Sequence, residues 1–352
     1  MSDISKQLIE RVAAARSAAE QLSIVGQSSK SFMGREPKGV PVSVAQHSGI
    51  VSYEPVELVM TARAGTTLTE ITAALDEQGQ ILSFEPPGFG GEASIGGTLA
   101  CNLSGPARPW SGSVRDMVLG LNLINGKAEQ LSFGGQVMKN VAGYDASRMQ
   151  AGAMGTLGII TEISFKVMPR PAATLTLVRE MGAAEAIDTM NQLAGKAKPL
   201  MGACWWENKL YLRLSGAQST VEGTAGQWQG DVLAGSSEFW AANREQQLSF
   251  FNGSSPLWRF SIRPSADHFQ PEGDWFIDWG GAQRWLRGEY DKNTLEAAAE
   301  NAGGQVSLFR GGDRSGEVFH RQSPALQGVH QRLKTAFDPD RVFNPGRLYS
   351  WL

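Results

Sequence analysis

The 352-residue chain contains few cysteines and no excess of positive charge. Its two cysteines, Cys101 and Cys204, lie far apart and form no C-x-x-C pair, so they cannot build a cysteine-ligated iron–sulfur cluster or a structural zinc site. No metal site is predicted. A net charge of −3 argues against the basic face that nucleic-acid binding needs, and no nucleic-acid partner is expected.

Long apolar runs are absent as well. No stretch of about 18 apolar residues occurs, which argues against a transmembrane helix. The N-terminal residues MSDISKQLIERV are polar, unlike a secretory signal, and the cysteines give no reason to expect an oxidising compartment. These absences predict a cytoplasmic protein. The length favours two domains of about 150 residues each.

Glycine, in contrast, is abundant, with 41 residues that recur most densely between residues 93 and 169. Short strand-like runs, 117–124 and 157–167, alternate there with glycine-rich loops. A similar loop, 26–31, follows a short apolar run. Loops of this kind can present free backbone N–H groups, which suit a long ligand that carries a phosphate. Neither the P-loop spacing nor a G-x-G-x-x-G fingerprint with a downstream acid is present.

The pattern of the chain changes at Arg170-Pro171. Beyond this point strand-like runs alternate with helical ones, which predicts an α+β domain with an antiparallel sheet. Eight of the ten tryptophans fall between Trp205 and Trp285, and most are expected in the core.

Several short motifs occur in a fixed order along the chain. They are I-V-G-Q-S-S-K at 24–30, P-P at 86–87, S-I-G-G-T at 94–98, K-N-V-A-G-Y-D at 139–145, G-T-L-G-I-I-T at 155–161 and F-D-P…N-P-G-R at 337–347. This ordered set resembles the FAD-binding domain of the vanillyl-alcohol oxidase and p-cresol methylhydroxylase superfamily. D-W-G-G-A at 278–282 and L-F-R-G-G-D-R at 308–314 are similar to segments of the family of smaller FAD-binding subunits of bacterial glycolate oxidase. The resemblance covers nearly the whole chain.

The resemblance implies an α+β fold. An FAD-binding domain of the p-cresol methylhydroxylase type, built in two parts, would occupy residues 1–170. An α+β cap domain with an antiparallel sheet would follow at 171–325, and the tail 326–352 would return to the flavin.

The resemblance also implies the residues that hold FAD. Residues 26–31 would bind the pyrophosphate through backbone N–H groups, in loops poor in fixed cations. The complete set of implied contacts is Gly26, Gln27, Ser28, Ser29, Lys30, Ser31, Pro86, Ser94, Ile95, Gly96, Gly97, Thr98, Asn102, Gly105, Gly143, Tyr144, Asp145, Gly155, Gly158, Ile159, Ile160 and Asn344. Relatives that bind flavin covalently use a histidine or cysteine near the ring. Gln27, Ser28 and Ile95 stand in the corresponding loops here, so non-covalent FAD is expected despite the nearby Cys101.

The implied activity is that of an FAD-binding subunit in a glycolate dehydrogenase complex, which oxidises glycolate to glyoxylate and also accepts D-lactate. The implied partners are a larger FAD-containing subunit and an iron–sulfur subunit, in a complex peripheral on the inner face of the cytoplasmic membrane. Related dehydrogenases cluster histidines near the C-terminus. This chain has only His47, His268, His320 and His330, without H-x-x-x-H spacing, so substrate oxidation is expected mainly at the larger subunit and electron relay at this one.

Two alternatives remain open on the sequence. The chain is a self-sufficient FAD-dependent 2-hydroxy-acid dehydrogenase, or it is a scaffold that has lost its cofactor. Catalysis by the chain itself would need a cation for the substrate carboxylate. The candidates are Arg259, Arg108 and Arg347. Arg259 leads because it lies inside an apolar run, where a lone cation needs a partner or a ligand.

Overall fold

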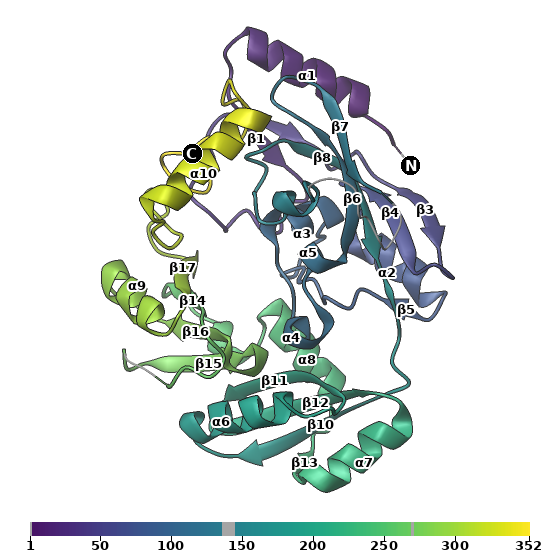
Figure 1. Ribbon diagram of the computed structural model, residues 1–352, viewed down its shortest axis with the longest axis vertical. Coiled ribbons are helices and arrows are strands. Elements are labelled where there is room, and N and C mark those ends of the chain that lie inside the picture. The colour runs from purple at the N-terminus through teal and green to yellow at the C-terminus, as the bar shows by residue number, and fades with distance from the viewer. Residues whose placement is uncertain (1, 136–144, 269–270) are drawn as a thin grey trace. The chain divides into compact units, whose positions relative to one another are not determined.

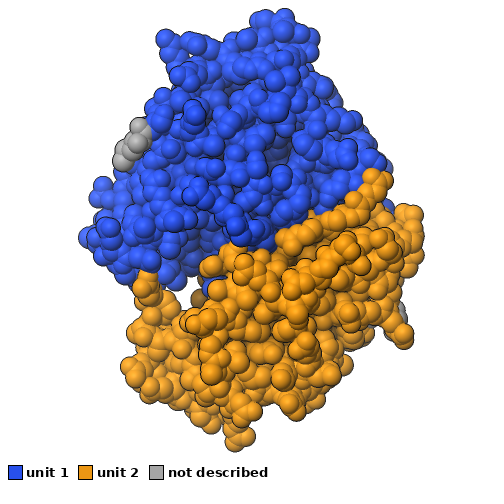
Figure 2. All heavy atoms as spheres, turned by 180° about the vertical axis from the view of Figure 1, so that it is seen from behind, with its two compact units in different colours: residues 1–103, 113–169, 314–352 blue, residues 104–112, 170–313 orange. Residues whose placement is uncertain are grey.

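The computed structural model describes residues 2–135, 145–268 and 271–352. These residues form two compact units, which Figure 2 distinguishes by colour. Unit 1 contains residues 1–103, 113–169 and 314–352, and unit 2 contains residues 104–112 and 170–313. Gly143 and Tyr144, two of the predicted FAD contacts, lie outside the described residues.

Unit 1 is built on a five-stranded antiparallel sheet with the order β3-β4-β8-β6-β7 (Figure 1). Two smaller sheets accompany it, the parallel pair β1-β2 and the antiparallel pair β5-β9. The strands are β1 (Leu22–Val25), β2 (Val40–Ser43), β3 (Ile50–Glu54), β4 (Val59–Arg63), β5 (Gln80–Ile81), β6 (Val118–Ile124), β7 (Gln130–Gly134), β8 (Ile159–Lys166) and β9 (Met168–Pro169). The helices are α1 (Ser5–Ser17), α2 (Leu68–Asp76), α3 (Ile95–Cys101), α5 (Val114–Met117), the 3-10 turn η1 (Arg148–Gln150) and α10 (Pro324–Phe337).

The main core of unit 1 lies between this sheet and helices α2, α3 and α5. Ile71 and Leu75 of α2 pack with Leu99 of α3 against sheet residues such as Ile163 and Phe165, and all five side chains are almost completely buried. Burial of such large apolar side chains supplies about 1.5–3 kcal/mol each. The helices are therefore held to the sheet by their apolar faces.

A second core joins the two ends of the chain. Val12 of α1 packs with Leu22 of β1 and with Phe343 from the C-terminal tail. The Leu22 N–H donates to the Val342 carbonyl at 2.7 Å, and the Asn344 N–H donates to the Leu22 carbonyl at 2.8 Å. The tail thus runs beside β1 like a further parallel strand.

Unit 2 contains an eight-stranded antiparallel sheet with the order β13-β10-β12-β11-β15-β16-β14-β17. Its strands are β10 (Ala173–Glu180), β11 (Leu200–Trp206), β12 (Lys209–Gly216), β13 (Asp231–Val232), β14 (Leu257–Ser261), β15 (Asp274–Asp278), β16 (Gln283–Arg287) and β17 (Gln305–Arg310). Its helices are α4 (Arg108–Ser111), α6 (Ala183–Ala194), α7 (Gln218–Trp228), α8 (Ser236–Glu245), α9 (Lys292–Asn301) and the 3-10 turns η2 (Ser249–Phe251) and η3 (Trp279–Gly281).

The predicted α+β class and the antiparallel sheet of the second domain are confirmed. The expected burial of the tryptophans holds for six of the eight, which are Trp228, Trp240, Trp258, Trp275, Trp279 and Trp285. Among the helices of the described ranges, none is both long and apolar enough to cross a bilayer.

The units differ from the predicted ranges 1–170, 171–325 and 326–352 at residues 104–112, at residues 314–325 and at Arg170, which belongs to unit 2. Residues 104–112 belong to unit 2, because Trp279 Nε1 donates to the Gly105 carbonyl at 3.0 Å and Trp110 packs on the core of that unit. Residues 314–325 belong to unit 1, where Arg35 donates to the carbonyl of Gly316 at 2.8 Å. The return to unit 1 therefore begins at Arg314.

Candidate functional site

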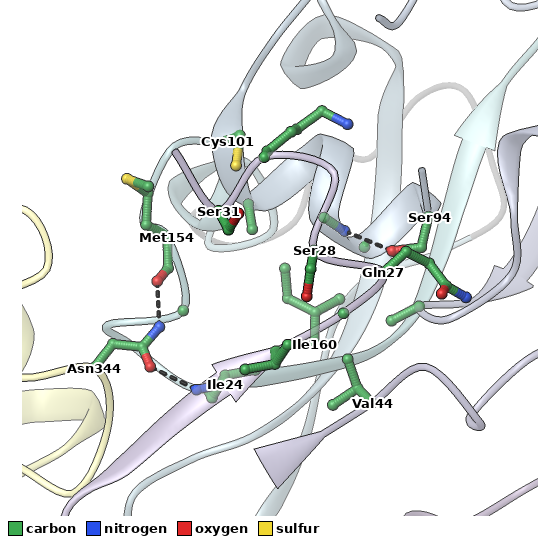
Figure 3. A pocket seen from close by; sticks show the side chains of 18 of the residues that line it. Ile24, Gln27, Ser28, Ser31, Val44, Ser94, Cys101, Met154, Ile160 and Asn344 are labelled. Atoms are coloured by element: carbon green, nitrogen blue, oxygen red, sulfur yellow. Dashed lines mark hydrogen bonds between the residues drawn. The ribbon is translucent and has the colours of Figure 1, made fainter. Parts of the chain in front are cut away.

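A pocket in unit 1 is formed by β1 and the loop after it, the N-terminal part of α3, the loop before β8, and the C-terminal tail (Figure 3). Its volume is about 220 Å³. The structure brings together, along this lining, the predicted residues Gly26, Gln27, Ser28, Ser29, Lys30, Ser31, Ser94, Gly96, Gly97, Gly155, Gly158, Ile160, Asn344 and Arg347. Residues from four distant parts of the sequence thus share one cavity.

The loop after β1 offers the pocket a row of backbone donors. Among the described residues, no protein acceptor takes a hydrogen bond from the N–H groups of Gly26, Gln27, Ser28 or Ser29. Ser28 has φ 61°, in the left-handed region. Successive N–H groups in a turn that contains a left-handed residue can converge on one point and form a concavity for an anion. The loop therefore fits a phosphate oxygen through its main chain.

Glycine is required where α3 begins beside this loop. The Ser94 hydroxyl accepts a hydrogen bond from the Gly97 N–H at 3.3 Å. A Cβ at Gly26 would lie 3.2 Å from that hydroxyl, and a Cβ at Gly96 would lie 2.6 Å from the Cβ of Ala64. A side chain at Gly26 would crowd the Ser94 hydroxyl, and one at Gly96 would push α3 away from Ala64, which directly follows β4.

Asn344 joins three walls of the pocket. Its side-chain carbonyl accepts the Ile24 N–H at 2.7 Å, and its side-chain amide donates to the Met154 carbonyl at 2.5 Å. A Cβ on Gly155 would lie 2.7 Å from the same amide nitrogen. The resemblance places Asn344 near the flavin ring; in the structure its amide also fastens β1 and the 154–155 turn to the tail.

Two cations line the pocket, which differs from the expectation of loops poor in fixed cations. Lys30 is buried, and its Nζ donates to the Ser29 hydroxyl at 3.3 Å. Arg347 donates to the Ser31 carbonyl at 3.0 Å and to the Arg35 carbonyl. Burial lowers the pKa of Arg347. Lys30 adds positive charge beside the backbone donors, whereas Arg347 fixes the shape of the loop.

Cys101 also lines the pocket. Burial raises the pKa of its thiol, although the positive charges of Lys30 and Arg347 act in the opposite direction. The thiolate is the nucleophilic form of cysteine, so a raised pKa keeps this side chain unreactive.

The remaining predicted contacts lie elsewhere. Ile95 and Ile159 are buried in the two cores of unit 1. Gly105 belongs to unit 2. Asp145 is exposed, and its Oδ2 forms an ion pair with Arg148 Nε at 3.1 Å. Pro86 is partly buried after β5.

Thr98 and Asn102 of the α3 segment carry polar atoms without partners. Thr98 Oγ1 and Asn102 Oδ1 are both buried, and in the described part of the chain neither makes a hydrogen bond. Buried polar atoms are nearly always paired in native proteins, so each unpaired one calls for a ligand or a water. Neither residue lines the pocket itself, so the fit to a polar cofactor such as FAD rests on the backbone donors of 26–29.

Unit 2 brings together two of the three candidate arginines. Arg259 of β14 lies 5.1 Å from the Trp279 ring and Arg108 of α4 lies 4.6 Å from it. Arg259 Nε donates to Gln283 at 2.7 Å, but its two terminal nitrogens have no acceptor among the described residues. Burial lowers the pKa of Arg259 to about 10; the charge of Arg108 acts in the same direction, and Asp278 opposes it. Arg347 is not part of this cluster, since it lies in unit 1.

Trp279, which sequence reasoning did not select as a site residue, holds this cluster in place. Its φ is 54°, although it is bulky, and Gly280 and Gly281 also have positive φ. The indole N–H donates to the Gly105 carbonyl at 3.0 Å. Strained backbone of this kind concentrates at ligand sites. The only signal in the sequence is an aromatic residue directly before two glycines.

Comparisons with known proteins define the class first. Residues 4–134 match the family model described as an FAD binding domain. Among solved structures, an alkyldihydroxyacetonephosphate synthase superposes with a TM-score of 0.68 over 97% of this chain and 74% of its own, at 15% identity. This likeness shows the fold. The chain is thus an FAD-binding protein with the fold of that class.

The particular family follows from a full-length match. The chain is 47% identical to glycolate oxidase subunit GlcE of Escherichia coli K12. The alignment spans 350 residues, which is 99% of each chain. It belongs to the family of this subunit. A D-lactate dehydrogenase of Anaerostipes hadrus is 30% identical over 40% of this chain and 29% of its own, and glycolate oxidase subunit GlcD of Bacillus subtilis is 31% identical over 37% and 27%.

Proposed function

We propose that this chain is the FAD-carrying small subunit of a glycolate dehydrogenase complex that oxidises glycolate to glyoxylate and also accepts D-lactate. Substrate oxidation takes place mainly at a larger FAD-containing subunit. This chain accepts electrons from it and passes them to an iron–sulfur subunit. The complex is peripheral on the inner face of the cytoplasmic membrane.

One observation carries the proposal: the pocket of unit 1 can bind a cofactor but offers no general base. Its lining in the described residues contains neither a histidine nor a carboxylate. Oxidation of a 2-hydroxy acid requires a base for the hydroxyl proton. A pocket without one suits electron transfer better than substrate oxidation. The two cysteines, Cys101 and Cys204, are too few for a cluster, so the iron–sulfur centre belongs to another chain.

The residues of this chain would hold FAD as follows. The N–H groups of Gly26–Ser29 bind the pyrophosphate, with Lys30 as counter-charge, and Gly96 and Gly97 of α3 lie against the cofactor. Asn344 and Arg347 keep the walls at the right separation. The protonated Cys101 thiol favours non-covalent binding. When bound, FAD supplies reversible hydride and single-electron transfer.

A second candidate function rests on the arginine cluster of unit 2. Arg259 and Arg108 concentrate positive charge beside Trp279, and a carboxylate would relieve the repulsion between them. A chain that binds its own 2-hydroxy acid there would be a self-sufficient dehydrogenase.

The deciding experiment is anaerobic mixing of the isolated, flavin-loaded chain with glycolate, followed by flavin absorbance. We expect no bleaching by the chain alone and bleaching after the partner subunits are added. Bleaching by the isolated chain would favour the self-sufficient enzyme. A purified chain without flavin absorbance, even after incubation with FAD, would favour the scaffold.

A further inference from the structure

Lys334 of α10 is completely buried, yet it is not isolated. Its ammonium group makes three hydrogen bonds, to the Thr156 carbonyl at 2.7 Å, to Asp338 Oδ2 at 2.7 Å and to the Phe343 carbonyl at 2.8 Å. An ammonium group has three donors, and all three are used. Lys334 does not line the pocket.

The partners of Lys334 connect it to two walls of the pocket. Thr156 directly follows Gly155 and lies in the turn that carries Gly155 and Gly158. Phe343 directly precedes Asn344, which fastens the tail to β1. The buried ammonium group of Lys334 therefore connects the 155–158 turn to the C-terminal tail, on the side of these segments away from the pocket lining.

Asp338 extends this connection along the tail. Its Oδ1 accepts the Val342 N–H at 2.9 Å, and its Oδ2 accepts the Phe343 N–H at 2.8 Å. The carboxylate thus bends the chain between α10 and Asn344 into a fixed turn. Lys334 and Asp338 together define the direction in which the tail approaches the pocket.

A gain in folding stability alone does not explain why the Lys334–Asp338 pair is buried. Removing two charges from water is costly, and a buried ion pair can often be replaced by apolar side chains with no loss of stability. A second lysine–carboxylate pair with the same i,i+4 spacing, Lys292–Glu296 of α9, lies in unit 2, where Nζ and Oε1 are 2.6 Å apart. That pair has a buried carboxylate but contacts no pocket wall, which makes it a matched reference.

We infer that Lys334 is a positioning residue for the cofactor, which sets the separation of the Gly155–Gly158 turn from the Asn344 segment before FAD binds. The inference rests on the assignment of the unit 1 pocket to FAD and not on the substrate. The Gly155–Gly158 turn and the Asn344 segment then have the same separation before and after FAD binds. The affinity for FAD depends on Lys334, although this side chain does not line the pocket.

The test compares Lys334→Met with Lys292→Met. Each substitution removes one ammonium and leaves one buried carboxylate. FAD affinity of the apoproteins is measured by flavin fluorescence, and folding by thermal denaturation. We expect Lys334→Met to raise the Kd for FAD about tenfold or more, since it removes three charge-assisted hydrogen bonds behind the pocket. Lys292→Met should leave this Kd within about twofold of the wild-type value.

Hydrogen exchange in the wild-type apoprotein tests the same inference without a substitution. The N–H groups of Thr156, Phe343 and Asn344 all donate to protein acceptors. Walls set in advance keep these three amides protected without FAD, and FAD should raise their protection no more than that of core amides in β8, because binding stabilises the whole folded unit. Amides that become protected only after FAD is added would overturn the inference.

The remaining outcomes are separable. A folded Lys334→Met chain that binds FAD as tightly as the wild type would overturn the role of Lys334 alone. A wild-type chain that binds no FAD would overturn the assignment of the pocket, and this inference with it.

Discussion

The two units use polar groups in opposite ways. In unit 1 the pocket is lined with backbone N–H groups, and the buried cation behind it, Lys334, has a partner for every donor. In unit 2 the cation Arg259 rests on aromatic rings, and its terminal nitrogens have no acceptor in the described ranges. The polar groups around the unit 1 pocket are thus held by protein contacts, whereas Arg259 in unit 2, with Asp278 nearby, keeps its terminal donors available for an anion.

This difference shows where binding energy originates in each unit. Backbone donors held by a packed core lose little freedom when a ligand binds, so they give affinity at low entropic cost. A partly buried guanidinium with a single hydrogen bond instead gains from an added carboxylate, because its other donors lack acceptors in the described part of the chain. The first arrangement suits a resident cofactor and the second a ligand that comes and goes.

The largest effect is expected from a side chain placed in the wall of the unit 1 pocket. Gly155 has φ 71°, and a Cβ there would lie 2.7 Å from the amide nitrogen of Asn344. Gly155→Ala should weaken FAD binding by about a hundredfold, because strain and the displaced Asn344 together cost about 3 kcal/mol. Titration of the apoprotein with FAD measures the loss.

Gly223→Ala is the matched control for that substitution. Gly223 lies in helix α7, and a Cβ there would meet no atom within 4 Å. This change should stabilise the chain by about 0.5–1 kcal/mol and leave FAD affinity unchanged. Normal FAD binding by Gly155→Ala would show that the pocket is not organised in advance, and the contrast between the units would disappear.

A smaller effect is expected from removal of the unpaired charge in unit 2. If unit 2 holds a 2-hydroxy acid, as in the second candidate function, Arg259→Met should weaken the binding of glycolate to the isolated chain about tenfold, as measured by calorimetry. The cost in stability should be about 1 kcal/mol, because the substitution removes one hydrogen bond, from Arg259 Nε to Gln283, and leaves an apolar side chain among aromatic rings.

Arg284 provides the comparison for Arg259. It is fully buried and donates to the carbonyls of Gly281 at 3.1 Å, Asp267 at 2.7 Å and Ala266. Arg284→Met should destabilise the chain by about 3 kcal/mol, since it leaves buried carbonyls without donors. If Arg259→Met were equally destabilising and left glycolate binding unchanged, Arg259 would be structural, and the two units would not differ in the way described.

The smallest effect concerns pH and the N-terminal segment of unit 1. His47 is fully buried; its Nδ1 accepts the Ile4 N–H at 3.2 Å, and its Nε2 has no partner among the described residues. Burial lowers the pKa of His47; Asp3 and Glu162 oppose this shift, and Arg63 adds to it. Because the unfolded chain then binds more protons, the stability contributed by neutral His47 is present above its usual pKa of about 6.5 and decreases below it.

Thermal denaturation at a series of pH values checks this. The melting temperature of the wild type should fall more between pH 7 and acid than that of His47→Gln, which keeps an acceptor but does not titrate. If the melting temperatures of the wild type and His47→Gln changed with pH in the same way, protonation of His47 would not contribute to the pH dependence of stability.

Much of the site could be predicted because it depends on the backbone. Glycines and small residues after a strand determine where N–H groups are free, and this pattern is visible in the sequence at residues 26–31 and 94–97. The α+β class follows from the alternation of apolar runs in the same way. The sequence was therefore sufficient to predict those parts of the site that depend only on the backbone conformation of a short segment.

The rest depends on contacts between residues far apart in the sequence. Lys334 and Thr156 are separated by 178 positions, and no local pattern indicates that a surface-type residue is buried behind a glycine turn. Gly105 could not be assigned to unit 2 from sequence, because its partner Trp279 lies 174 positions away. Trp279 was read as core material, and only its positive φ distinguishes it.

The path of the tail has a consequence for when the pocket can form. Leu22 of β1 is bonded to Val342 and Asn344, so β1 is completed by a segment far along the sequence. The pocket therefore needs that segment to be in place beside β1, and we expect FAD to bind only afterwards. A chain that ends at Phe337 lacks this wall, and we expect it to be purified without flavin absorbance; a yellow truncated protein would contradict this. Bound FAD would then report that the segment around Asn344 is present and paired with β1.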